Sequence, residues 1–160
     1  MAQQKQYILV DGYNVTHSWP QLKRMMGHDI DAAASLLVER LSVLHDAVSC
    51  EVTVVFDGKS DAVETMYPAG DKAPCVIYSP SGTSADAIIE QIVNNAPDGD
   101  AFTVVSKDNA LCLSVFARGA HVISPETLLE RVRKERDLMS KTLLAQRKKH
   151  NSDFGNKLFQ

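Results

Sequence analysis

Short runs of consecutive apolar residues alternate along this chain with longer segments in which apolar residues recur every three or four positions. The clearest runs are YILV (7–10), VTVVF (52–56) and FTVV (102–105). Uninterrupted apolar runs of this length are typical of parallel strands that are covered on both faces. Two shorter runs, VIY (76–78) and HVI (121–123), are also interpreted as strands.

Helical segments are predicted between these runs. Residues 31–48 carry an apolar stripe at spacings of three and four, formed by Ala34, Leu37, Leu41, Leu44 and Val48. Three further helices are predicted: 84–95, 109–117, and one that begins at Pro125 and continues to His150 before a frayed end. Strands that alternate with helices predict an α/β sandwich with a mainly parallel sheet.

The segment 58–74 fits neither pattern. It reads GKSDAVETMYPAGDKAP, with two glycines, two prolines and no clear period. We predict a long loop or a mobile hairpin, and loops of this length inside compact domains are often functional.

Composition narrows the class of protein. A chain of 160 residues, 44% hydrophobic and 23% charged, is expected to form one globular domain. No apolar run is long enough to cross a bilayer, and the first residues, MAQQKQ, do not resemble a signal peptide. The three cysteines form no CxxC pair. Together these features predict a reduced, cytoplasmic setting.

Acidic residues follow the predicted strands. Asp11 and Asp57 come directly after the first and second strands, and Asp108 comes shortly after FTVV. Asp86 lies in the first turn of the helix that follows VIY. Because the carboxyl ends of parallel strands meet at one edge of an open sheet, where ligands usually bind, these four acids are predicted to gather there.

Each acid also has an ordinary structural explanation. Asp86 and Asp108 are typical of helix N-termini, and Asp57 with Gly58 is a common turn pair. Four gathered carboxylates, however, repel one another unless a cation is bound. Carboxylates bind a metal through oxygen atoms alone, and such a ligand set suits Mg²⁺ or Mn²⁺ rather than zinc. The set therefore predicts a divalent-metal site, which is well suited to hydrolysis of phosphodiesters.

Further polar residues near the four acids are also candidates for the site. Asn14 and Ser106 are predicted to donate or accept hydrogen bonds at the ligands or at the phosphate. Glu90 lies one turn after Asp86 on the same helix face, where it is either a further ligand or a solvated helix residue. Tyr13 and Trp19 are predicted to be packing residues rather than platforms for base stacking, and of the two Tyr13 is the better stacking candidate because it neighbours Asp11.

Four motifs resemble a known family. VDGYN, VVFDG, GTSADAIIE and VVSKD occur in this order and resemble the YacP-like branch of the NYN nuclease domains, within the PIN-like superfamily. The resemblance covers roughly residues 7–133. It implies a three-layer α/β/α fold with strand order 3-2-1-4-5 and metal-dependent endoribonuclease activity, with RNA as the partner in a ribosome or RNA-processing context. Lys107 departs from the family pattern, because members often have a small or polar residue directly before the last Asp of the set, which is Asp108 here.

Carried over by position, the resemblance implies one catalytic and metal-binding set, which consists of Asp11, Asp57, Asp86 and Asp108, with Asn14 beside Asp11. The metal would be Mg²⁺ or Mn²⁺.

Three other functions share parts of this pattern. A receiver domain would use Asp57 as phospho-acceptor with Lys107, but it needs two adjacent acids at the first strand, and Gly12 follows Asp11. A haloacid-dehalogenase-type phosphatase needs a second Asp where Tyr13 stands. A non-catalytic RNA-binding module of the same fold would keep all four acids as a metal-dependent binding site.

The C-terminal segment is strongly basic, although the whole chain has a net charge of −3. We divide the chain into a nuclease-like domain, residues 1–133, and a basic helical extension, residues 134–160. Eight cations are candidates for RNA binding: Arg131, Arg133, Lys134, Arg136, Lys141, Arg147, Lys148 and Lys149.

The same segment has a structural interpretation. Leu128, Val132, Met139 and Leu143 fall on one side of the predicted helix, so the helix either docks on the sheet or joins two copies of the chain. Outside this segment, Lys23, Arg24 and Lys59 are predicted to contact phosphate from loops near the acidic edge.

Overall fold

A six-stranded sheet forms the centre of the computed structural model, which describes residues 5–47, 50–68, 70 and 74–158. The strand order is β3-β4-β2-β1-β5-β6. The strands are β1 (Gln6–Asp11), β2 (Cys50–Phe56), β3 (Glu64–Met66), β4 (Cys75–Tyr78), β5 (Phe102–Val105) and β6 (His121–Ile123). All neighbours pair in parallel except β3, which pairs with β4 in the antiparallel direction.

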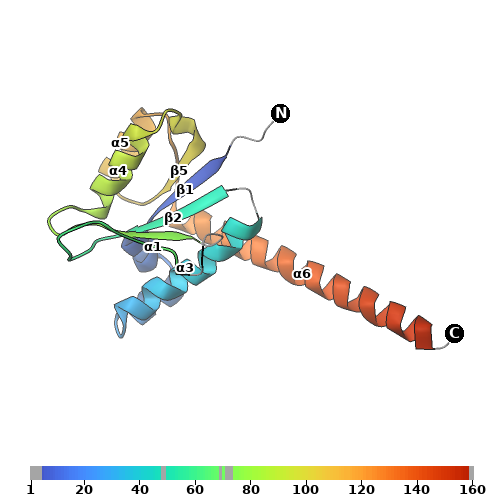
Figure 1. Ribbon diagram of the computed structural model, residues 1–160. Coiled ribbons are helices and arrows are strands. Elements are labelled where there is room, and N and C mark those ends of the chain that lie inside the picture. Colours follow the sequence, from blue (N-terminus) through green and yellow to red (C-terminus); the bar gives the residue numbers. More distant parts are fainter. Residues whose placement is uncertain (1–4, 48–49, 69, 71–73, 159–160) are drawn as a thin grey trace.

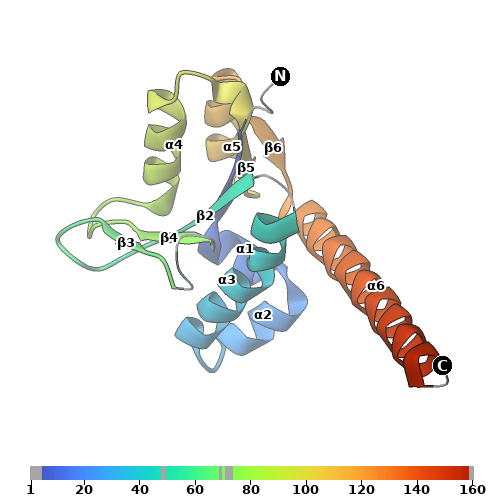
Figure 2. The same ribbon diagram turned by 45° about the vertical axis from the view of Figure 1, so that its right-hand side comes forward.

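Helices cover both faces of this sheet (Figures 1 and 2). They are α1 (Gly12–Ser18), α2 (Pro20–Met26), α3 (Ile30–Ala47), α4 (Ala85–Asn95), α5 (Asn109–Ala117) and α6 (Pro125–Leu158), with a 3₁₀ turn η1 (Gly99–Ala101). Helices α1, α2, α3 and the start of α6 lie on one face, and α4 and α5 lie on the other. The chain therefore has the three-layer α/β/α, PIN-like fold that was predicted.

Alternation along the central strand explains how one sheet carries two cores. Ile8 and Val10 point into the core beneath α1, α2, α3 and α6, whereas Leu9 points into the core beneath α4 and α5. All three side chains are buried. A strand covered on both faces must be apolar at every position, which is why YILV shows no alternation.

Most predicted elements are confirmed. The five parallel strands, numbered without β3, have the order 3-2-1-4-5 that the resemblance implied. The predicted stripe of the third helix is buried at Ala34, Leu37, Leu41 and Leu44. Its last member, Val48, lies outside the described residues.

The hairpin alternative for 58–74 is confirmed in the described part of that segment, where β3 pairs with β4. Three features differ from the predictions. Helices α1 and α2 were not predicted. Helix α6 continues past His150 to Leu158 instead of fraying. Lys23 and Arg24 lie in α2 rather than in a loop.

Helix α6 is packed only at its beginning. Leu128 and Val132 are buried, while every described side chain from Arg136 to Ser152 is exposed. Both ribbon views show the rest of α6 extending away from the body of the molecule (Figures 1 and 2). In the described part of the chain, none of the helices is both long and apolar enough to cross a membrane.

Two glycines after strand-terminal acids are required by close packing. A Cβ on Gly12 would lie 2.4 Å from ring atoms of Phe56, and a Cβ on Gly58 would lie 2.1 Å from the carbonyl oxygen of Ser79. Neither position has room for a side chain, because the chain turns sharply at the end of β1 and of β2. The Asp-Gly pairs at 11–12 and 57–58 therefore reflect tight exits at one edge of the sheet.

Candidate active site

The structure brings the four predicted acids to the carboxyl edge of the parallel sheet. Asp11 is the last residue of β1, and Asp57 immediately follows β2. Asp86 is the second residue of α4, and Asp108 is the N-cap of α5, after β5. Since β1 pairs with both β2 and β5, the ends of these strands are neighbours.

Asp11 is the most enclosed acid of the set. Its side chain is only 8% exposed, and the Ser106 hydroxyl donates a 2.9 Å hydrogen bond to its Oδ2. Burial raises the pKa of Asp11 to about 7, against the lowering effect of the Ser106 hydrogen bond, and the negative charges of Asp86 and Asp57 add to the increase. At neutral pH this carboxyl is therefore poised between its two protonation states.

Asp86 is the direct neighbour of Asp11. Burial raises the pKa of Asp86, a hydrogen bond with Asp11 lowers it, and the charges of Asp108, Asp57 and Glu90 raise it further. The same interaction raises the pKa of Asp11, so of the two acids it favours the proton on Asp11. These two acids form a close pair, and Glu90 is near enough to act on it electrostatically.

Asp108 caps a helix, as its structural interpretation predicted, and Asp57, which was interpreted as part of a turn pair, also accepts a hydrogen bond from a helix N-terminus. Asp57 Oδ1 accepts a 2.7 Å hydrogen bond from the backbone N–H of Ala85, and Asp108 Oδ1 accepts one of 2.9 Å from that of Leu111. Asp86 does not cap α4, because the Ser84 hydroxyl accepts from the backbone N–H of Ala87 at the N-terminus. Capping therefore explains Asp57 and Asp108, but it does not explain the Asp11–Asp86 pair.

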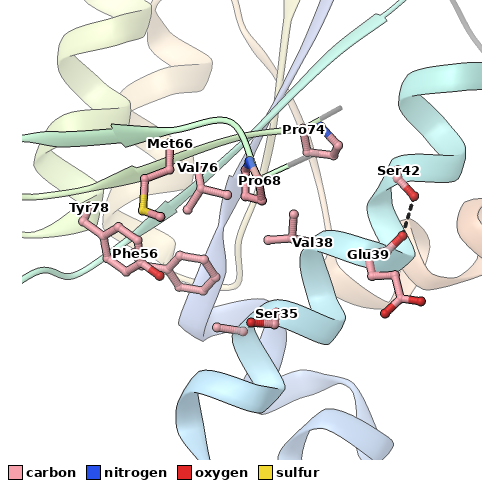
Figure 3. Close-up of a pocket in the computed structure, with 11 residues that line it drawn as sticks. Ser35, Val38, Glu39, Ser42, Phe56, Met66, Pro68, Pro74, Val76 and Tyr78 are labelled. Carbon is pink, nitrogen blue, oxygen red and sulfur yellow. Dashed lines mark hydrogen bonds between the residues drawn. The ribbon is translucent and has the colours of Figure 1, made fainter. Parts of the chain in front are cut away.

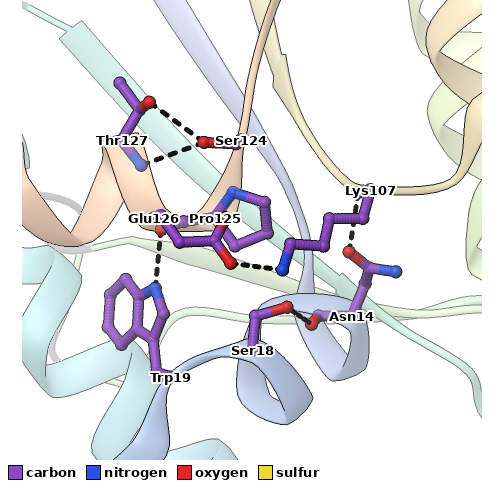
Figure 4. Close-up of polar contacts among 8 residues, drawn as sticks. All are labelled: Asn14, Ser18, Trp19, Lys107, Ser124, Pro125, Glu126 and Thr127. Carbon is purple, nitrogen blue, oxygen red and sulfur yellow. Dashed lines mark hydrogen bonds and ion pairs between the residues drawn. The ribbon is translucent and has the colours of Figure 1, made fainter.

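Ser106 and Asn14 hold the segment between β5 and α5 against β1 and α1. The Ser106 hydroxyl accepts a 3.1 Å hydrogen bond from the backbone N–H of Asp108, and Asn14 Oδ1 accepts one of 2.8 Å from that of Lys107 (Figure 4). The Lys107 ammonium forms an ion pair with Glu126 at the start of α6. The positive charge that departs from the family pattern is thus directed toward Glu126.

The side chains do not form a closed metal-binding geometry as they stand. Among the described residues, no three His, Cys, Asp or Glu side chains are arranged to hold a metal ion. In each helix-capping acid, Oδ1 is engaged with the helix, and among the described residues no hydrogen bond is found at Oδ2. A shared cation would therefore require the carboxylates at this edge to change their orientation.

Cys112 is a neighbour of the site that sequence reasoning missed. Its thiol donates to the Ser106 carbonyl oxygen at an S–O distance of 3.5 Å. Burial raises the pKa of Cys112, as do the negative charges of Asp108, Asp11 and Asp86. Its position one turn after Asp108 on the same helix was the available signal.

An apolar pocket lies apart from the acids, between α3 and the β3–β4 pair. Its volume is about 360 Å³, and its lining includes Val38, Met66, Val76, Phe56 and Tyr78 (Figure 3). The Phe56 ring packs against Tyr78 on one side and Tyr13 on the other. This contact confirms the predicted packing role of Tyr13.

Trp19 is also a packing residue. It is only 3% exposed, and its indole Nε1–H donates a 2.7 Å hydrogen bond to the Pro125 carbonyl oxygen (Figure 4). This bond joins the α1–α2 junction to the first residue of α6. It orients the basic helix relative to the acidic edge.

The fold and motifs match one family over almost the entire chain. A model of the YacP-like NYN domain matches residues 8–160, so it includes the whole of α6. The chain belongs to the YacP-like NYN domain family. The match extends beyond the segment 7–133 on which the sequence resemblance rests.

Relatives of this NYN domain come from Bacillus subtilis. The chain is 28% identical over 128 residues to the uncharacterized protein YacP of strain 168, an alignment that covers 78% of this chain and 74% of that protein. Rae1 (YacP) has also been solved as a tryptophan-to-leucine mutant, whose sequence is 27% identical to this chain and whose crystal structure matches it with a TM-score of 0.68. That match covers 85% of this chain and 79% of the mutant chain. A second Rae1 (YacP) structure is 24% identical to this chain, with a TM-score of 0.71. The match covers 86% of this chain and 79% of that chain, and it shows the shared fold.

Proposed function

We propose that this NYN domain is a divalent-metal-dependent endoribonuclease that hydrolyses RNA phosphodiesters at its acidic edge. The observation that carries the proposal is the Asp11–Asp86 pair, which joins the buried acid at the end of β1 to a half-buried acid in the first turn of α4, with Asp57 and Asp108 beside it. Perturbed carboxyl pKa values at the carboxyl edge of a parallel sheet are typical of functional sites. The family supports the proposal because the NYN domain has a nuclease-like fold.

The donor set fits Mg²⁺ or Mn²⁺. All four side chains offer carboxylate oxygens, which these hard cations prefer. The negative charges of the acids raise the pKa values of Asp11 and Asp86, and a bound cation would offset this repulsion. A bound divalent ion would supply an activated water and stabilise charge on the phosphate oxygens. Asp11 and Asp86 are proposed as the central ligands, with Asp57 and Asp108 beside them and Glu90 as a further candidate.

The other residues of the site would position these groups. Ser106 fixes the orientation of Asp11, and Asn14 fixes the backbone before Asp108. The N-termini of α4 and α5 lie at the same edge, where their positive dipole ends favour a phosphate. The chain would thus bind the phosphodiester electrostatically while the acids hold the cation.

Two observations bear on the alternatives. A receiver domain has the strand order 2-1-3-4-5, whereas the parallel strands here have the order 3-2-1-4-5, so the receiver interpretation is wrong. A non-catalytic RNA-binding module would use the same fold and acids, so only an activity measurement separates it from the nuclease.

RNA is the proposed partner, in a ribosome or RNA-processing context and in the cytoplasm. The exposed cations of α6 beyond the packed turns support a contact with an RNA backbone. The competing use of α6 is self-association, for which Leu138, Met139, Leu143 and Leu144 offer exposed apolar surface.

The test is cleavage of structured and unstructured RNA by purified protein with Mn²⁺, Mg²⁺ or a chelator. The proposal expects cleavage with metal and none with chelator, and loss of cleavage in Asp11→Asn and Asp86→Asn. Asp98→Asn is the matched control, because Asp98 is exposed and precedes β5 at the opposite edge of the sheet. Metal-dependent RNA binding without cleavage would instead identify the binding module.

A further inference from the structure

A polar cavity lies among the helices on the α3 face of the molecule, and it is lined by residues of α2, α3 and α6 and of the α1–α2 junction. It has a volume of about 300 Å³ and is open to solvent, since Arg24, Arg133 and Arg136 are exposed. Four arginines line it: Arg24, Arg40, Arg133 and Arg136. None of the four acids of the candidate active site contributes to its lining.

The arginines are held on a well-packed base. Trp19, Leu22 and Val132 line the cavity and are each no more than 3% exposed. The Trp19 hydrogen bond to Pro125 fastens α6 to the α1–α2 junction. Arg133 and Arg136 are three residues apart, so they share one face of α6.

Among the residues that the structure describes, no carboxylate forms an ion pair with these guanidinium groups. The ion pairs found in the described part of the chain join Lys5 to Glu51 and Lys107 to Glu126, and neither includes an arginine. Arg40 instead donates a 3.3 Å hydrogen bond from Nη2 to the side-chain oxygen of Gln21. Four like charges around one cavity repel one another, so an anion bound there would be stabilised.

The chemistry of the lining selects a phosphate. Guanidinium groups donate paired, parallel hydrogen bonds that match the oxygens of a phosphate, and arginine is preferred to lysine for this recognition. The other polar side chains of the lining already have partners, because Gln21 accepts a hydrogen bond from Arg40 and the Trp19 indole donates one to Pro125. We propose that this four-arginine pocket binds a phosphate of the RNA backbone, at a nucleotide other than the one that is cleaved.

The position of the pocket suits this role. Arg133 follows Pro125 by eight residues, which is about 12 Å along the helix axis. Helix α6 begins at Pro125, shortly after the end of β6. The next residue, Glu126, forms an ion pair with Lys107, which directly precedes Asp108. The beginning of α6 therefore lies at the acidic edge. An RNA strand that reaches from the acids to the pocket would pass along this first part of α6. The identity of the phosphate as RNA rests on the proposed function, whereas anion binding by the pocket does not.

The first test measures RNA affinity in chelator, so that no cleavage occurs, at several salt concentrations. The variants are Arg40→Gln and Arg136→Gln, alone and together, with Arg118→Gln as the control, because Arg118 is exposed at the end of α5 and outside the pocket. Each phosphate that a variant no longer binds is expected to flatten the slope of log affinity against log salt by roughly 0.7 on single-stranded RNA. Thermal melting checks that the variants fold. Slopes equal to that of the wild type in folded variants would overturn the proposal.

The second test separates the pocket from the catalytic site. Cleavage of a dinucleotide, which is too short to reach the pocket, is expected to be equal in the wild type and the double variant, while cleavage of a long RNA falls at subsaturating concentration. Equal loss on both substrates would overturn a role confined to the pocket. If the wild type cleaves no RNA, the proposed function fails, but the change in salt slope would still support the pocket.

The third test distinguishes the source of the phosphate. Inorganic phosphate is titrated into the wild type and the double variant by calorimetry, and the wild type alone is expected to bind. Phosphate that also competes with RNA, together with a flatter salt slope in the variants, supports an RNA phosphate. Phosphate binding with an unchanged RNA slope would overturn the RNA assignment and identify a site for a free phosphate.

Discussion

The Ser106 hydroxyl donates a 2.9 Å hydrogen bond to the carboxylate of Asp11, although the two residues are separated by 95 positions in the chain. Both side chains are buried. This hydrogen bond lowers the pKa of Asp11 and partly offsets the increase that burial causes. The end of β5 therefore adjusts the protonation of the acid at the end of β1.

Replacement of Ser106 by alanine is expected to raise the pKa of Asp11 further and to move the acidic limb of the pH–activity profile to higher pH. Removal of the hydrogen bond should also reduce the free energy of unfolding by about 1 kcal/mol. The measurement is kcat/KM for RNA cleavage against pH with Mn²⁺. Ser42→Ala, which removes a hydroxyl bonded within α3, is the control. Superimposable profiles for wild type and Ser106→Ala would contradict this role.

The raised pKa of Asp11 predicts a pH dependence of stability without metal. Between the unfolded value of 3.8 and the folded value of about 7, the folded state binds more protons than the unfolded chain. The free energy of unfolding should therefore decrease as pH rises through this window, by at most about 1.4 kcal/mol per unit, and level off above it.

Urea unfolding of the metal-free protein at several pH values measures this dependence. Asp11→Asn should show a flatter curve over the same window, because the group that takes up the extra proton is gone. A stability that increases across the window in the wild type, relative to Asp11→Asn, would show that Asp11 is ionised in the folded protein.

Divalent metal should stabilise the wild type by mass action, since the four acids are assembled only in the folded state. At a hundredfold excess over the dissociation constant, the gain is about 2.7 kcal/mol. Thermal melting with chelator and with Mn²⁺ measures it. The shift should shrink in Asp11→Asn and stay unchanged in Asp98→Asn. Equal shifts in all three proteins would place the metal elsewhere.

Asp86→Asn is expected to abolish RNA cleavage and to leave the protein folded. Ser84 still caps α4, and the amide keeps the volume of the carboxylate. Because Asp86 repels the other acids, its neutralisation should raise the melting temperature of the metal-free protein. Cleavage assays and melting curves are compared with those of Asp98→Asn. A fully active, purified Asp86→Asn protein would refute the four-acid site.

The sequence was sufficient to predict the parallel strands and the convergence of the acids, for a physical reason. Strands buried on both faces must be continuously apolar, and parallel order places all of their carboxyl ends together. Asp11, Asp57, Asp86 and Asp108 follow directly from those two rules. The pairing of Asp11 with Asp86, and not with Asp57, depends on side-chain directions that the rules do not specify.

The features that were missed have weak local signals. Helix α1 contains Gly12, Asn14 and the β-branched Val15 and Thr16, which are poor helix formers, and it is stabilised by packing of Val15 in the core. Strand β3 has only three residues, and all of them are exposed, so it has no buried face whose apolar residues could mark it as a strand in the sequence. The four-arginine pocket joins side chains from three helices, and only the packing of α6 on α2 and α3 brings them together.

The basic part of α6 is expected to act as an RNA-binding arm. Truncation after Arg136 removes four of the eight candidate cations, namely Lys141, Arg147, Lys148 and Lys149, and it retains the buried turns at Leu128 and Val132. Long RNA should then bind more weakly, and the slope of log affinity against log salt should flatten by roughly 0.7 for each phosphate that the arm no longer binds. Cleavage of a dinucleotide should be unchanged, because the acids are untouched.

A charge-only variant separates the arm from self-association. Lys141→Gln, Arg147→Gln, Lys148→Gln and Lys149→Gln together keep the helix and its exposed Met139, but remove the same cations. If α6 binds RNA, this variant and the truncation should flatten the salt slope equally, and light scattering should show the same number of chains per particle in all three proteins. If α6 joins two copies of the chain, only the truncation should reduce the number of chains per particle, and the salt slope should be the same in all three proteins. The second result would rule out the arm, because exposed cations that bind phosphate must contribute to the salt dependence.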